Sequence, residues 1–155
     1  MQKRLNHLIG ADLVMLHFAG DMSMWGFSGS SFSSQLHVQC SYRLTYSNKN
    51  LLCQSDVFTI VNYEKFNTLL HLERDLIKLF ILPVQVTNAI LYDNQDIQIY
   101  FGDDLVLYVY ADSVVTEEQW RYWEELYGLH GEGPEYIAID GTIKSYKGSC
   151  QSTKE

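Results

Sequence analysis

The strongest structural signal in this chain is an alternation of apolar and polar side chains within residues 93–112. Apolar side chains occupy every second position from 97 to 101 and again from 105 to 109. The one exception to the alternation is Val106, an apolar residue at a position where a polar one is expected. A period of two over this length predicts two β-strands. Gly102 and Asp103 stand between them and predict a β-hairpin, because Gly takes the positive φ of tight hairpin turns at little cost.

Two loop lengths are compatible with this hairpin. A two-residue loop at Gly102 and Asp103 suits a type II′ turn, but it pairs Phe101 with Asp104 and puts the two apolar rows on opposite faces. A three-residue loop, residues 102–104, puts both rows on one face. Since a one-residue slip flips every side chain, burial favours the three-residue loop. The other face then carries tyrosines and acids, namely Tyr100, Tyr108, Tyr110, Asp96, Asp104 and Asp112.

The length of 155 residues indicates one domain, which we place at residues 1–147, with a flexible tail at residues 148–155. No apolar run reaches the roughly 18 residues of a membrane span. The first residues lack the continuous apolar region of a signal peptide. The three cysteines are an odd number without paired spacing, as expected of reduced thiols. We therefore expect a cytoplasmic protein that does not enter a membrane.

The net charge of −8 is unevenly distributed along the chain. Residues 1–78 hold seven Lys/Arg and six Asp/Glu, whereas residues 79–155 hold four and thirteen. Between Asp93 and Asp140 there are twelve acids and one base, Arg121. Such a field repels nucleic acid and attracts basic partners, although acidic surfaces also serve solubility alone. We therefore expect no nucleic-acid binding.

The remaining periodicities predict an α+β fold made mainly of antiparallel strands arranged as meanders. Helical spacing of apolar residues predicts one principal helix near residues 63–82, which Pro83 ends. A short helix is predicted near residues 117–126, where Thr116 can act as its N-cap.

Residue patterns that would carry chemistry are weak in this sequence. His37 and Cys40 differ in parity, so on one strand they point to opposite faces and do not form a metal site. No nucleophile elbow, phosphate-binding loop or dinucleotide fingerprint is present. The paired acids, such as Glu117 and Glu118, are typical of turns and helix starts rather than of a catalytic cleft. We therefore expect no enzyme activity, no cofactor and no metal.

With no catalytic pattern present, the aromatic and acidic residues of the second half are best interpreted as a protein-binding surface. Aromatic side chains supply apolar anchors at interfaces, and carboxylates pair with Arg and Lys. Whether Trp120 and Trp123 belong to the core or to this surface is open. The candidate partner-binding residues are Asp96, Tyr100, Asp103, Asp104, Tyr108, Tyr110, Asp112, Glu117, Glu118, Tyr122, Glu124 and Glu125.

Several segments together resemble a known group of bacterial proteins. They are residues 8–20 (LIGADLVMLHFAG), residues 36–44 (LHVQCSYRL), the Gln54-Ser55-Asp56 step, residues 96–113 (DIQIYFGDDLVLYVYADS) and residues 117–120 (EEQW). The pattern, which covers residues 8–123, resembles the small immunity proteins of contact-dependent growth inhibition and related polymorphic toxin systems. Tyr42 stands where Trp is expected.

The resemblance implies a non-enzyme that stays in the cytoplasm and neutralises one cognate toxin domain, often a nuclease, by tight binding. A nuclease has a basic substrate cleft, so an acidic and aromatic surface would suit it. The alternative is a structural or regulatory interaction module without catalytic activity, with weak self-association through exposed strands.

Overall fold

A computed structural model describes residues 1–19, 22–54, 84–112, 116–126 and 132–147 of the chain. The expected principal helix at residues 63–82 and the expected tail at residues 148–155 lie outside the described residues. Eleven strands form one sheet in the described part. They are β1 (Asp12–Ala19), β2 (Met22–Ser28), β3 (Phe32–Val38), β4 (Ser41–Tyr46), β5 (Lys49–Cys53), β6 (Val84–Leu91), β7 (Ile97–Phe101), β8 (Leu105–Tyr110), β9 (Trp120–Leu126), β10 (Glu132–Ile139) and β11 (Thr142–Tyr146).

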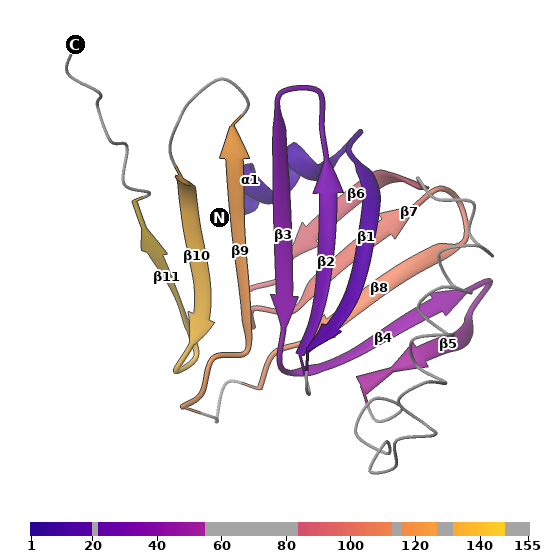
Figure 1. The fold of residues 1–155 in the computed structure, drawn as a ribbon. Helices are drawn as coiled ribbons and strands as arrows, with labels where there is room; N and C mark the ends of the chain where they lie inside the picture. Colours follow the sequence, from indigo (N-terminus) through magenta and orange to yellow (C-terminus); the bar gives the residue numbers. More distant parts are fainter. Residues whose placement is uncertain (20–21, 55–83, 113–115, 127–131, 148–155) are drawn as a thin grey trace.

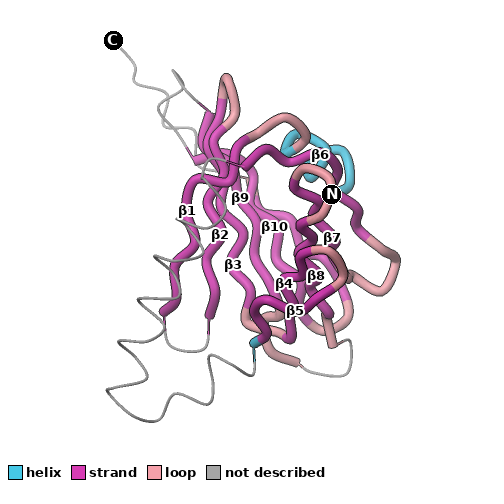
Figure 2. Tube along the Cα trace, turned by 90° about the vertical axis from the view of Figure 1, so that its right-hand side faces the viewer, coloured by secondary structure: helices cyan, strands magenta, loops and turns pink. Residues whose placement is uncertain are grey.

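The sheet folds over on itself into two layers. Its strand order is β11-β10-β9-β3-β2-β1-β6-β7-β8-β4-β5. Figure 1 shows that β11 to β1 of this order form a first layer, and that β6 to β5 form a second layer behind it. The layers join where β1 pairs with β6 through Asp12 opposite Gln85 and Leu13 opposite Val84. Figure 2 shows the same two layers from the side.

The core lies between the two layers and is held by large aromatic side chains. The rings of Phe27 and Phe101 stack across it with centroids 6.4 Å apart. Trp25 meets Tyr42 edge-on at 6.1 Å. All four side chains are buried, and burying one large apolar side chain stabilises the fold by about 1.5–3 kcal/mol.

The β7–β8 hairpin confirms the three-residue loop. Phe101 lies opposite Leu105, so residues 102–104 form the turn, and Gly102 has a φ of +57°. Both apolar rows face the core and every member is buried: Ile97, Ile99, Phe101, Leu105, Leu107 and Val109.

The predicted short helix at residues 117–126 is wrong, because residues 120–126 form strand β9. This strand pairs with β3 on one side and with β10 on the other. Glu and Arg favour helices only weakly, by tenths of a kcal/mol per residue, so two flanking strands easily override that preference.

The expected α+β class is also wrong, because the described fold is almost entirely antiparallel β-sheet. The helical elements that the structure describes are the short α1 (Gln2–Leu5) and the 3-10 turn η1 (Asn6–Leu8). Leu5 and Leu8 from these two turns are completely buried. The side chain of Gln2 donates to the Ala89 carbonyl at 3.0 Å and accepts from the Leu91 N–H at 2.7 Å. The N-terminal segment therefore continues the hydrogen bonding of β6 beyond the end of its pairing with β1.

Candidate functional site

The outer face of the second layer carries a group of tyrosines around one glutamine. We call this group, formed by Tyr92, Gln98, Tyr100, Tyr108 and Tyr110, the tyrosine face. The hydroxyls of Tyr92 and Tyr100 both donate to Gln98 Oε1, at 3.0 and 2.7 Å. The rings of Tyr108 and Tyr110 are stacked with centroids 6.2 Å apart. These contacts link Tyr92 to Tyr100 through Gln98, and Tyr108 to Tyr110, on one face of the sheet.

The phenol groups of this face are close enough to influence one another. Burial raises the pKa of Tyr100, and the neighbouring hydroxyls of Tyr92 and Tyr108 raise it further. Tyr100 therefore remains a neutral hydrogen-bonding hydroxyl at physiological pH. A hollow of about 230 Å³ opens at the end of this face, lined by Tyr92, Asn94, Asp96, Ile97, Gln98, Tyr108, Val109 and Tyr110.

The acids expected beside these tyrosines differ in their surroundings. Asp96 is partly buried, and its carboxylate accepts from the Ala111 N–H and from the Asn94 side chain, both at 2.8 Å. Asp103 and Asp104 are exposed in the turn of the hairpin, and Asp112 is exposed after β8. Asp96 therefore anchors the hairpin, whereas the other acids are accessible to a partner.

A basic side chain lies beside the tyrosine face, in addition to the acids around it. Arg43 on β4 is exposed and lies opposite Tyr108 on the same face. A guanidinium next to phenol rings adds a donor to the surface and can stack on them.

The predicted binding residues do not form one continuous surface. Glu117 is exposed before β9, and Glu118 is partly buried there. Along β9, Arg121, Trp123 and Glu125 point to the outer face of the first layer, because the strand alternates. The expectation that Tyr122 and Glu124 are on the surface is wrong, since both side chains are fully buried.

Glu124 and Tyr122 instead belong to a buried polar cluster under the N-terminal helical turn. Glu124 Oε1 accepts from the Tyr122 hydroxyl at 2.8 Å and lies 3.3 Å from His7 Nδ1. Arg4 Nη1 lies 3.4 Å from Glu124 Oε2. Burial and the Glu124 carboxylate raise the pKa of Tyr122, so its proton stays on the hydroxyl. The cluster ties the N-terminus to β9.

The two tryptophans of β9 have different environments. Trp120 is in the core, where its Nε1–H donates to the Gln95 carbonyl at 2.9 Å. Trp123 is partly exposed on the outer face of the first layer, where its ring lies nearly perpendicular to the His37 ring with centroids 4.3 Å apart.

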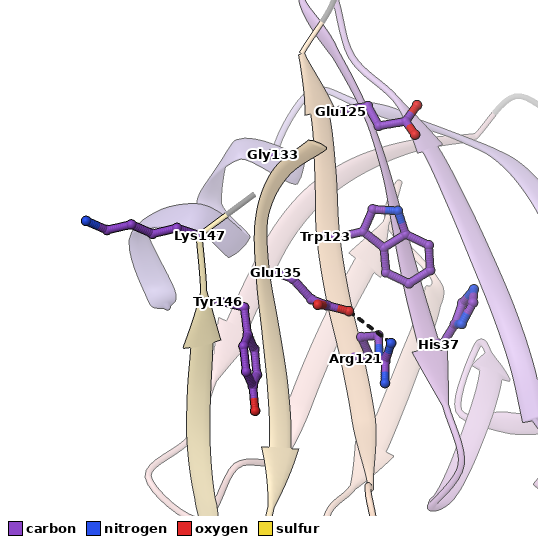
Figure 3. Close-up of a pocket in the computed structure, with 8 residues that line it drawn as sticks. All are labelled: His37, Arg121, Trp123, Glu125, Gly133, Glu135, Tyr146 and Lys147. Atoms are coloured by element: carbon purple, nitrogen blue, oxygen red, sulfur yellow. Dashed lines mark ion pairs between the residues drawn. The ribbon is translucent and has the colours of Figure 1, made fainter. Parts of the chain in front are cut away.

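Trp123 forms part of a second hollow, which the sequence did not predict. We call it the aromatic hollow; its volume is about 310 Å³, and it is lined by His37, Arg121, Trp123, Glu125, Gly133, Glu135, Tyr146 and Lys147. In Figure 3, Tyr146 lies on one side of Glu135 and Trp123 on the other. Alternation in WRYWEEL is the signal that would have placed Arg121 and Trp123 on one face, had this segment been interpreted as a strand.

Arg121 is held in the floor of the aromatic hollow by two carboxylates. Its Nε and Nη2 donate to Glu118 at 3.1 and 2.7 Å, and its Nη1 lies 3.0 Å from Glu135 Oε1. These contacts raise the pKa of Arg121, and the hydrogen bonds that it donates to Glu118 are the largest cause. Burial and the charge of Arg121 lower the pKa of His37, while Glu118 partly opposes this. His37 is therefore neutral at pH 7.

Other chemical features of the described residues are limited. Burial raises the pKa of the Cys40 thiol to about 12, which keeps it protonated. No cluster of three or more His, Cys, Asp or Glu suited to a metal ion occurs in the part of the chain that the structure describes. Nor does any helix within that part have the length and apolarity needed to cross a membrane.

Comparisons with protein-family models, with curated proteins and with solved structures found no match.

Proposed function

We propose that this chain is an immunity-type protein that binds and neutralises one cognate toxin domain in the cytoplasm, without catalysing a reaction. The observation that carries the proposal is the tyrosine face, with exposed acids at both ends of β8. Tyrosine supplies a large contact area at low cost in side-chain entropy, and it is enriched where proteins bind one another. Tyr92 and Tyr110 are about 40% exposed (41% and 39%), so their rings are available to a partner.

The charge around this face favours a basic partner. Asp103 and Asp104 make no ion pair with any residue of the described part of the chain. Unpaired surface carboxylates can therefore accelerate the approach of a basic domain, and the rings slow its release once bound. The basic substrate cleft of a nuclease is a surface of this kind.

The test is to express the chain together with the toxin encoded directly upstream of it. Protection of the cells and a one-to-one complex are expected. Unchanged killing in cells that contain the folded protein would contradict an immunity function.

A second experiment tests which surface binds. Changing Asp103 and Asp104 to Lys should weaken toxin binding mainly through a slower association rate, by about tenfold or more at low salt. The control is Glu125→Lys, which reverses one carboxylate, where the hairpin variant reverses two, on the outer face of the opposite layer. If the control weakens binding as much as the hairpin variant, the tyrosine face is not the interface.

The second candidate function is a structural or regulatory interaction module that self-associates. It is favoured by β11, which is an edge strand of the sheet with mostly exposed side chains. Edge strands carry unpaired backbone groups that can pair with another chain. A concentration-dependent dimer in sedimentation experiments, together with no binding to the toxin, would favour this candidate.

A further inference from the structure

The aromatic hollow contains a carboxylate in line with two aromatic rings on neighbouring strands. Glu135 on β10 lies directly opposite Trp123 on β9 and also directly opposite Tyr146 on β11. Neighbouring strands are about 4.8 Å apart, so the backbones of the two aromatic residues are roughly 10 Å apart. Figure 3 shows the Glu135 carboxylate in the space between the two rings.

The groups in this hollow favour a cation over an anion. Three of the N–H groups of Arg121 are already directed at Glu118 and Glu135, so an anion would have to displace a carboxylate to bind it. Lys147 extends away from the other lining side chains in Figure 3. His37 adds no positive charge at neutral pH, since its pKa is lowered. Glu125 adds a further carboxylate at the rim.

The Glu135 carboxylate can accept hydrogen bonds from a ligand as well as from Arg121. An ionised carboxylate offers about four acceptor positions, and one described partner of Glu135 is Arg121 Nη1 at 3.0 Å. The side chain of Glu135 is 32% exposed, so the remaining positions can be reached from the hollow.

We propose that the aromatic hollow binds the guanidinium group of an arginine side chain presented by a protein partner. The planar guanidinium stacks between Trp123 and Tyr146 and donates to Glu135. Cations over Trp and Tyr faces are attracted by the ring quadrupoles, and a planar guanidinium also stacks on them, which an ammonium group does not. The hollow borders the edge strand β11, so a segment of another protein can approach it. This site is on the opposite layer from the tyrosine face and does not depend on the function proposed above.

The test is a nuclear magnetic resonance titration of the whole chain with the peptide acetyl-Gly-Gly-Arg-Gly-Gly-amide. The matched peptide with citrulline in place of arginine has nearly the same shape but no charge. We expect the Trp123 indole N–H signal to shift with the arginine peptide and not with the citrulline peptide. The indoles of Trp25 and Trp120 serve as internal references, because they donate to Ser23 Oγ and to the Gln95 carbonyl inside the core, each at 2.9 Å.

Variants test the roles of the side chains. Glu135→Gln and Tyr146→Leu should each weaken the binding of the arginine peptide by about two- to fivefold. This is the affinity that one exposed ion pair or cation–π contact contributes. Glu135→Gln keeps an oxygen for Arg121, and Tyr146 is half-exposed at the edge of the sheet, so both variants should fold. Tyr46→Leu is the matched control, because Tyr46 has a similar exposure on β4 of the second layer and should not affect binding.

Four results would overturn the proposal. Equal shifts with the citrulline peptide would show that charge is not recognised, and unchanged affinity in both variants would remove the aromatic and carboxylate roles. A Trp123 shift with inorganic phosphate or with methyl glucoside, but not with the arginine peptide, would assign the hollow to an anion or a sugar. Binding of ethylguanidinium without binding of the peptide would indicate a small free cation and not a protein partner.

Discussion

The Tyr122 hydroxyl donates to Glu124 Oε1 at 2.8 Å, and both side chains are completely buried. This places an acidic side chain at the inner face of β9, where Arg4 and His7 from the N-terminal turn approach it. A buried carboxylate needs such partners, because leaving it without them costs several kcal/mol. The relationship explains how the first residues of the chain are fixed to a strand more than 100 residues away.

Removing the carboxylate should therefore destabilise the whole fold. We expect Glu124→Ala to lower the free energy of unfolding by about 2–3 kcal/mol, less than for a fully buried pair because Arg4 is partly exposed. Urea denaturation measures this difference. The control Glu125→Ala alters the next, exposed residue and should change stability by no more than about 0.5 kcal/mol. Equal losses in the two variants would contradict a structural role for Glu124.

The turn of the β7–β8 hairpin should tolerate some residues at position 102 and not others. Gly102 has a φ of +57°, and an added Cβ would meet nothing within 4 Å. The cost of a substitution is therefore the backbone conformation itself, about 1 kcal/mol for Gly102→Ala. Gly102→Asn should cost less, because Asn visits this region more readily. Thermal denaturation compares the melting temperatures of the two variants. If Gly102→Asn lowered the melting temperature as much as Gly102→Ala, the left-handed backbone conformation at this position would be contradicted.

His37 should make the protein less stable at mildly acidic pH. Burial and the charge of Arg121 hold its pKa below the ordinary value of 6.5. Between that lowered pKa and 6.5 the unfolded chain binds a proton that the folded chain does not, so stability rises with pH across this window. Urea denaturation at pH 7.5 and 5.5 should show a smaller loss on acidification in His37→Gln than in the original protein. An equal loss of stability on acidification in the two proteins would show that His37 does not cause this pH dependence.

The described cysteines should differ in their reactivity toward alkylating reagents. Burial raises the pKa of Cys40 to about 12, so almost no thiolate is present at pH 8. Cys53 is only partly buried. With iodoacetamide at pH 8, peptide mapping by mass spectrometry should find Cys53 modified well before Cys40, and Cys40 should react only when urea unfolds the protein. Rapid modification of Cys40 in the native protein would contradict its burial.

The period-two alternation predicted the β7–β8 hairpin and its register correctly, because both depend on local order and on burying one apolar row. Phe101 and Leu105 are only four residues apart, so the turn between them determines which side chains share a face. Tyr100, Tyr108 and Tyr110 of the tyrosine face followed from the same alternation, whereas Tyr92, which precedes the hairpin, was not predicted. Interactions between near neighbours were therefore sufficient for this part of the candidate site.

The segment from Trp120 to Leu126 could not be assigned in the same way. Its glutamates and its aromatic spacing are compatible with a helix. It forms a strand because it pairs with β3 on one side, where Val38 lies opposite Trp120, and with β10 on the other, where Ala138 lies opposite Trp120. That choice determined which side chains were buried. It moved Tyr122 and Glu124 into the core and brought Trp123 beside Glu135 in the aromatic hollow.

The sequence by itself determined the hairpin of residues 97–110, its apolar and tyrosine faces, and the acidic character of the second half of the chain. Only the tertiary structure decided the fold class, the burial of Glu124 and the formation of the aromatic hollow. The physical reason is the distance along the chain between the interacting groups. His37 and Trp123 are brought together by the pairing of β3 with β9, and Arg4 reaches Glu124 from the N-terminal helical turn. No local periodicity encodes either contact.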